Sequence, residues 1–149
     1  MSSLIKAVQS VMTIHLLLMT SSRSNDVSCV KHSNGCSIPG GLGYFYKDEF
    51  TPPCDRHDIC YACGQYHNVS RDECDDGFLH DMKRACNNRR RRHVVHRHVH
   101  KRHVFCYMAA YKYYYAVHWF GGSRYTDDNS PDYCEEPWIP SCLPRKCLS

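Results

Sequence analysis

The octapeptide CDRHDICY, at residues 54–61, combines a histidine, an aspartate and a tyrosine with two cysteines. Adjacent residues on a helix project about 100° apart, so His57 and Asp58 cannot serve each other directly and must face two different neighbours. Cys60 and Tyr61 follow His57 at the i+3 and i+4 positions, which puts all three on one helix face. Asp58 projects toward the segment that flanks this helix. The octapeptide therefore places a proton-transfer group beside a carboxylate that can bind a cation.

A helix is expected to carry this octapeptide. Thr51 precedes Pro52 and Pro53, the pattern of an N-cap residue with proline in the first turn, where a missing backbone N–H costs nothing. We therefore expect the helix to run from Thr51 to about Ala62 and to end near Gly64.

A second helix is expected after a short connection. Ser70 and Glu73 form a capping box, because the serine hydroxyl accepts from a helical N–H while the glutamate reaches back to the serine N–H. This pattern predicts a helix from Arg71 to about Cys86. The connection at residues 64–69 can only return the chain, so the two helices should pack antiparallel.

The remaining segments differ in composition. Residues 34–46 are rich in glycine, which favours a loop with exposed backbone carbonyls. Residues 105–120 are rich in tyrosine and suit a helix or a strand by pattern, and we expect a helix. Residues 121–149 contain several prolines and are expected to be irregular, pinned by their cysteines Cys134, Cys142 and Cys147. The expected fold class is mainly α, a small disulfide-rich secreted domain in which two antiparallel helices carry the active site.

The cysteine content indicates the compartment. The chain has 149 residues, enough for one small domain, and 11 cysteines, which an oxidising compartment turns into disulfides. At the amino end Lys6 precedes an apolar run at residues 11–19 and a small polar stretch, which indicates a secretory signal peptide over residues 1–24. The alternative for this run is an amphipathic or buried helix. The odd number of cysteines leaves one that is free, intermolecular or paired in a dimer.

The formal net charge of +4 favours an anionic surface, either a phospholipid interface or a nucleic acid. Nearly all of the clustered positive charge lies at residues 89–103, and the chain outside it is close to neutral, so charge alone does not choose between these surfaces. The partner we expect, a phospholipid membrane surface and no nucleic acid, is the one implied by the family resemblance described below. Arg89–Arg92 matches a furin-type cleavage site, and Lys101–Arg102 offers a second one. The histidines of this run offer an alternative, the binding of zinc or of an anionic polymer.

The octapeptide resembles the active-site helix of the secreted phospholipases A2, whose pattern is cysteine, two residues, histidine, aspartate, one residue, cysteine and tyrosine. That family places a cysteine and an aspartate on the opposing helix, where this chain has Cys74 and Asp75. The sequence of residues 29–88 is most similar to the conodipines, phospholipase A2 toxins of cone snail venoms.

The resemblance implies a catalytic set on the two helices. His57 would be the base that takes a proton from water as the water attacks the ester carbonyl. Asp75 would accept a hydrogen bond from the other imidazole nitrogen, and Tyr61 would hydrogen-bond to that carboxylate.

The resemblance also implies Ca²⁺ as cofactor, held in a calcium-binding loop next to the first helix. The ligands would be the carboxylate of Asp58 and the carbonyls of Gly35 and Ser37, with Asn34 at a position where bacterial relatives use an aspartate. Ser37 and Pro39 occupy positions that are glycine in the pancreatic and snake enzymes, which leaves the ligand set open. The ion would polarise the ester and stabilise the oxyanion.

The family pattern would pair Cys36 with Cys54 and Cys60 with Cys74, whereas the spacing of Cys60 and Cys63 alone is also compatible with zinc or redox chemistry. The implied precursor has a signal peptide (1–24), a phospholipase A2-like alpha chain (25–88), an excised basic propeptide (89–102) and a disulfide-linked beta chain (103–149).

The function implied is a secreted, extracellular venom toxin that hydrolyses the sn-2 ester of phospholipids with calcium. The alternative is a phospholipase-like toxin that acts mainly by binding a receptor or ion channel. A cysteine-rich structural or zinc module is a third class, which calcium-dependent fatty acid release would exclude.

Overall fold

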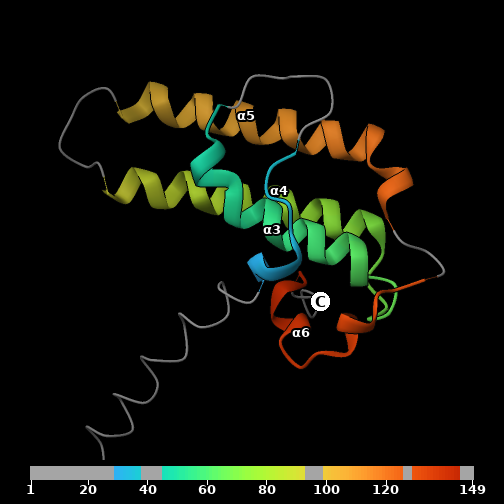
Figure 1. The fold of residues 1–149 in the computed structure, drawn as a ribbon. Helices are drawn as coiled ribbons and strands as arrows, with labels where there is room; N and C mark the ends of the chain where they lie inside the picture. The colour runs from blue at the N-terminus through green and yellow to red at the C-terminus, as the bar shows by residue number, and fades with distance from the viewer. Residues whose placement is uncertain (1–28, 38–44, 93–98, 126–128, 145–149) are drawn as a thin grey trace, which may run out of the picture.

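The computed structural model describes residues 29–37, 45–92, 99–125 and 129–144, and these residues form helices and no strand (Figure 1). The expected mainly α class is therefore confirmed for this part of the chain. The expected signal peptide, the rest of the glycine-rich loop and Cys147 lie outside it. The long helices are α3 (Lys47–Cys63), α4 (Arg71–Arg92) and α5 (Val99–Phe120). The short ones are η1 (Val30–His32), η2 (Gly122–Arg124), η3 (Asp132–Glu135) and α6 (Ile139–Cys142).

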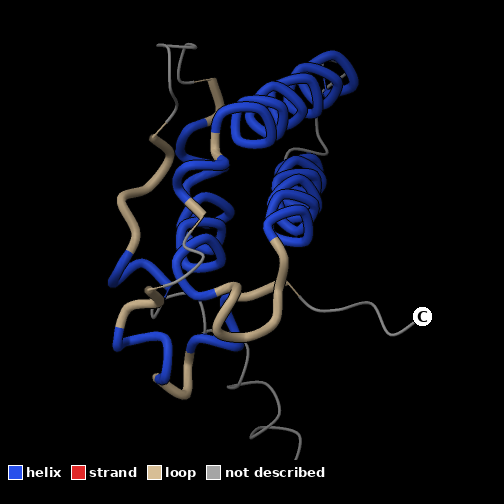
Figure 2. The backbone as a smooth tube through the Cα atoms, turned by 90° about the vertical axis from the view of Figure 1, so that its right-hand side faces the viewer, coloured by secondary structure: helices blue, strands red, loops and turns tan. Residues whose placement is uncertain are grey.

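The helix α4 is the centre of the arrangement, because it packs against both α3 and α5. It returns alongside α3 in the opposite direction, as the short connection predicted (Figure 1). Figure 2 shows the three long helices side by side, with the C-terminal segment gathered below one end of α3. In that segment α6 packs on α3, as does η1 from the amino-terminal side.

The helix α3 begins four residues earlier than expected. It starts at Lys47, so Thr51 is not its N-cap, and the Thr51 hydroxyl instead donates to the Lys47 carbonyl at 2.8 Å. Pro52 and Pro53 lie inside the helix. The extra turn brings in Phe50, which is fully buried, and this tertiary packing outweighs the local proline signal.

The helix α4 begins where the capping box predicted. The Ser70 N–H donates to Glu73 Oε2 at 2.7 Å, and the Glu73 N–H donates to Ser70 Oγ at 3.3 Å. The helix continues six residues past the expected end at Cys86, because Cys86 is bonded to Cys106 and the end of α4 packs beside α5.

The described cysteines form five disulfides. Cys36–Cys54 joins the loop to α3 and Cys60–Cys74 joins α3 to α4, the two pairings that the family resemblance implies. Cys60 and Cys63 bond to different partners, so they do not form a zinc or dithiol site. The other three bonds are Cys29–Cys142, Cys63–Cys134 and Cys86–Cys106. Each of these three links the part of the chain before the basic run to the part after it.

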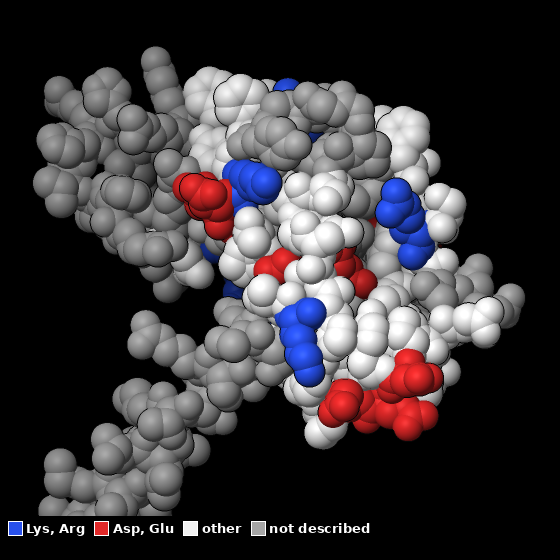
Figure 3. All heavy atoms as spheres, in the orientation of Figure 1, with Lys and Arg blue, Asp and Glu red and all other residues white. Residues whose placement is uncertain are grey.

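Two clusters of buried side chains make up the core. One lies between the end of α3, the start of α4 and the C-terminal segment, and includes Ile59 and Ile139. The other lies between the start of α3, the rest of α4 and α5, and includes Phe50 and Met82. None of the described helices is long and apolar enough to cross a membrane. On the face in Figure 3, basic and acidic side chains are interspersed, apart from an acidic group at the lower end.

Candidate active site

The catalytic set expected from the sequence is held together at the contact between α3 and α4. His57 Nε2 lies 2.9 Å from Asp75 Oδ1, and the Tyr61 hydroxyl donates to the same oxygen at 2.7 Å. Asp75 is 0% exposed, and His57 and Tyr61 are buried as well. The Cys60–Cys74 disulfide lies beside these residues and fixes the spacing of the two helices. The three side chains therefore form one buried hydrogen-bonded network.

The hydrogen bond to Asp75 defines the protonation state of the histidine ring. A carboxylate only accepts, so Nε2 carries the proton and Nδ1 of a neutral ring is left as an acceptor. Among the described residues Nδ1 takes part in no hydrogen bond. The ring is packed between Tyr61 and Phe78, with centroid distances of 4.1 Å and 4.6 Å. This packing holds the ring still while Nδ1 stays available.

Tyr61 is a fixed donor in this network. Burial raises the pKa of the Tyr61 hydroxyl far above its ordinary value of 10.0, and the hydrogen bond to the Asp75 carboxylate raises it further. The hydroxyl therefore stays protonated over the pH range in which a histidine acts as a base.

Asp58 faces the other way, toward the loop at residues 34–37. The Asn34 N–H donates to Asp58 Oδ2 at 3.1 Å. Partial burial raises the pKa of Asp58 above its ordinary 3.8, while the Asn34 N–H and the nearby His57 lower it. The carboxylate is thus a partly desolvated charge that a cation would stabilise.

The loop at residues 34–37 supplies oxygen atoms beside Asp58. Gly35 has a φ of 71°, which a glycine adopts without strain, and its carbonyl accepts from the Ser37 N–H at 2.9 Å. The side-chain amide N–H of Asn34 donates to Asp58 Oδ2 at 3.2 Å. The Cys36–Cys54 disulfide ties the loop to α3. Carboxylate and carbonyl oxygens are ligands that Ca²⁺ prefers, so Asp58 and the carbonyls of this loop fit this ion.

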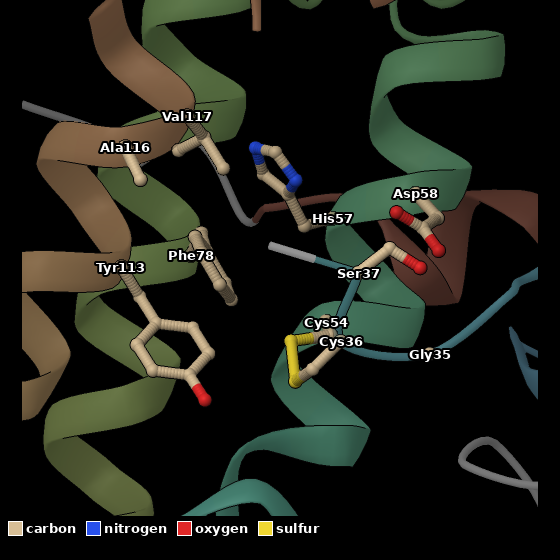
Figure 4. A pocket seen from close by; sticks show the side chains of 10 residues that line it. All are labelled: Gly35, Cys36, Ser37, Cys54, His57, Asp58, Phe78, Tyr113, Ala116 and Val117. Atoms are coloured by element: carbon tan, nitrogen blue, oxygen red, sulfur yellow. A yellow bond between two sulfur atoms is a disulfide. The ribbon is translucent and has the colours of Figure 1, made fainter. Parts of the chain in front are cut away.

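His57, Asp58 and residues 35–37 of the loop line one pocket of about 350 Å³, a volume that includes space open to solvent. Figure 4 shows His57 and Asp58 on the α3 side and apolar residues of α5 on the facing side. The Phe78 ring of α4 lies between them. The lining residues are Gly35, Cys36, Ser37, Cys54, His57, Asp58, Phe78, Tyr113, Ala116 and Val117.

Sequence reasoning missed the contribution of α5. Tyr113, Ala116 and Val117 form a pocket wall, and His118 lies next to Asp75, with 3.5 Å between His118 Nδ1 and Asp75 Oδ2. Helical periodicity predicts an apolar face on α5, but no local signal tells which helix that face contacts.

A second group of potential cation ligands lies on the opposite side of Asp75. One ligand atom from each of Asp72, Asp75 and His118 falls within 4.8 Å of the others. This group contains none of the expected calcium ligands. Arg71 Nε also lies 3.9 Å from Asp75 Oδ2, and a guanidinium at this distance disfavours a cation there. The residues that the resemblance implies as calcium ligands all lie on the Asp58 side.

Comparison with known proteins agrees with this geometry. The family described as prokaryotic phospholipase A2 matches residues 10–121. Conodipine-P2 and Conodipine-P3 of Conus purpurascens are 54% and 52% identical over 59 residues, which are 40% of this chain and 32% of each relative. Conodipine-M alpha chain of Conus magus is 43% identical over 58 residues, 39% of this chain and 74% of that relative. The match thus spans about a third of the first two relatives. No solved structure matches.

Proposed function

The chain belongs to the prokaryotic phospholipase A2 family, and from this premise we propose that it is a secreted, calcium-dependent phospholipase A2 that hydrolyses the sn-2 ester of phospholipids at a membrane surface. The observation that carries the proposal is the arrangement in one pocket of His57, bonded to buried Asp75, and Asp58, directed at an oxygen-rich loop. The similarity to conodipines supports the further proposal that it is a venom toxin.

The residues of α3 and α4 would carry out the proton transfers. Nδ1 of His57 accepts a proton from the water that attacks the ester carbonyl, and later returns it to the leaving alcohol. Asp75 keeps the proton of the neutral ring on Nε2 and stabilises the imidazolium that forms. Tyr61 donates to Asp75 throughout, which fixes the orientation of the carboxylate.

The calcium ion would be held by Asp58, Asn34, Gly35 and Ser37. When bound, it supplies a positive charge that polarises the ester carbonyl and stabilises the oxyanion. The apolar wall from Phe78 and α5 suits an acyl chain and keeps water from the reacting atoms other than the attacking one.

Release of fatty acid from phosphatidylcholine vesicles carrying a labelled sn-2 chain tests this proposal. We expect release with calcium and none with a chelator. His57→Gln should lower the rate by about 10³-fold or more, since removal of the base leaves only binding and electrostatic stabilisation. His80→Gln on the exposed face of α4 is the matched control and should act as wild type.

Release that persists in folded His57→Gln would contradict the proposed mechanism. A wild-type protein that releases no fatty acid yet binds a membrane protein would favour the alternative function, that of a toxin directed at a receptor or ion channel.

We also propose that the basic run at residues 89–102 is excised, leaving an alpha chain (25–88) and a beta chain (103–149). Three disulfides support this proposal, because Cys29–Cys142, Cys63–Cys134 and Cys86–Cys106 would hold the two chains together. The match to an alpha chain of a relative points the same way. Mass spectra of the native product should show one species before reduction and two after it. A single polypeptide under both conditions would overturn this proposal.

A further inference from the structure

We infer that His118, in the last turn of α5, is a positioning residue that holds the second oxygen of Asp75. This inference rests on the proposed function of the same site. It starts from the two oxygens of Asp75, which differ in their surroundings. Oδ1 receives both His57 Nε2 and the Tyr61 hydroxyl. Oδ2 is buried and has no hydrogen-bond partner within the part of the chain that the structure describes.

The atom that faces Oδ2 is also buried and unpartnered. His118 Nδ1 lies 3.5 Å from Asp75 Oδ2, at the long limit of a hydrogen bond, and forms no other one among the described residues. Arg71 Nε lies 3.9 Å from Asp75 Oδ2, too far for a hydrogen bond. A buried donor and a buried acceptor that both lack a hydrogen bond and face one another are stabilised by approaching. A shift of a few tenths of an ångström would make this hydrogen bond.

The end of α5 is held in place over the network by further contacts. Arg71 Nη2 donates to the His118 carbonyl at 3.0 Å, and the Tyr114 ring stacks on the His118 ring at 5.4 Å. Gly121 approaches so closely that an added Cβ would lie 2.7 Å from the Tyr61 hydroxyl oxygen. Arg71, at the start of α4, thus ties the last turn of α5 to the helix that carries Asp75.

His118 and the other residues of this network lie on opposite sides of the basic run. His57, Tyr61 and Asp75 all precede the basic run, whereas His118 follows it. If the run is excised, His118 enters the active site from the second chain, and that chain contributes directly to catalysis as well as to stability.

Two substitutions test whether the hydrogen bond from His118 to Asp75 matters, as distinct from the shape of the His118 ring. His118→Asn places an amide N–H near the position of Nδ1, whereas His118→Leu removes the donor. We expect His118→Leu to lower kcat about 10- to 100-fold with KM unchanged, the range found for groups that orient a functional residue. We expect His118→Asn to stay within a few-fold of wild type. His103→Leu is the control, because His103 lies on the same helix and contacts Asn87 and the Tyr107 ring, not Asp75.

Failure of the proposed function and failure of the positioning role would give different results. A wild-type protein without calcium-dependent hydrolysis would show that the proposed function is wrong. An active wild type with an equally active His118→Leu variant would overturn the positioning role. So would a His118→Asn variant as impaired as His118→Leu, or a change in KM alone. Thermal unfolding of each variant checks that it is folded, and His118→Ala replaces the leucine variant if that one is not.

Discussion

At the scale of single residues, the partial burial of the Asp58 carboxylate lowers the stability of the folded protein near neutral pH. Its pKa is raised by burial, so its charged form is less favourable in the folded than in the unfolded chain. The stability that this group contributes is present below its ordinary pKa of 3.8 and is lost as the pH rises through the raised value. Near neutral pH the ionised carboxylate therefore destabilises the calcium-free protein, and a cation bound there, as proposed, would offset that cost.

We therefore expect Asp58→Asn to unfold at a higher temperature than wild type in a chelator at pH 7. Calcium should stabilise wild type by about 2.7 kcal/mol at a concentration of a hundred times Kd, and the variant should lose this response. Circular dichroism melts with calcium and with chelator measure both effects, and Asp132→Asn, on the exposed surface, is the control. A calcium-induced rise in Tm that is the same in Asp58→Asn and wild type would place the ion elsewhere.

The directions of His57 and Asp58 could be predicted because they depend only on helix geometry. Two adjacent residues of α3 face two neighbours, one on α4 and one on the loop, and no long-range information is needed to see it. The contact of His118 with Asp75 could not be predicted in this way. It depends on where α5 docks after a basic run whose conformation the local pattern does not define.

At the scale of elements, the start of α3 also depends on long-range packing that the local sequence does not define. The proline pair is a local signal, and it gave Thr51 as the first residue. The helix begins at Lys47 because Phe50 packs edge-on against the Tyr113 ring of α5 at 5.3 Å. By contrast, the capping box of α4 is satisfied within four residues, and the start of that helix was predicted correctly.

The helix α5 also has an outward face that carries large apolar side chains. They recur every three or four residues along the helix, on the side away from the pocket wall. An exposed row of apolar and aromatic side chains suits the interface of a phospholipid surface. There Tyr and Trp place the apolar part of the ring among the lipids and keep the polar group in contact with water. The exposed residues of this row are Val104, Met108, Tyr111, Tyr115 and Trp119.

We expect Trp119→Ala to weaken binding to phospholipid vesicles on the order of tenfold, since burial of one large side chain is worth about 1.5–3 kcal/mol when complete. Hydrolysis of vesicles should fall accordingly, while hydrolysis of a monomeric short-chain phospholipid should stay unchanged. Vesicle sedimentation and initial rates measure the two effects. Tyr66→Ala, an exposed aromatic residue in the turn between α3 and α4, is the control. An equal loss on both substrates would mean that Trp119 acts on the pocket and not on the surface.

At the scale of the whole molecule, the disulfides divide into two kinds. Cys36–Cys54 and Cys60–Cys74 close short loops within the part that resembles known phospholipases, so the family pattern implied them. The other three join the parts of the chain on either side of the basic run, with separations of 113, 71 and 20 residues. Cysteine spacing does not predict their pairing, because Cys29–Cys142 and Cys63–Cys134 depend on how the C-terminal segment packs, and Cys86–Cys106 depends on how α5 packs on α4.

If the basic run is excised as proposed, those three bonds require that disulfide formation precede cleavage. While the chain is continuous, the cysteines on either side of the basic run meet within one molecule, at an encounter frequency independent of dilution. Once it is severed and reduced, the two pieces must find each other as separate solutes. We expect reduced precursor to regain activity on reoxidation at any dilution, and the reduced, processed protein to regain it only in proportion to concentration. Oxidation in the secretory compartment would then have to come before proteolysis, and the processed protein, once reduced, would regain its structure only poorly.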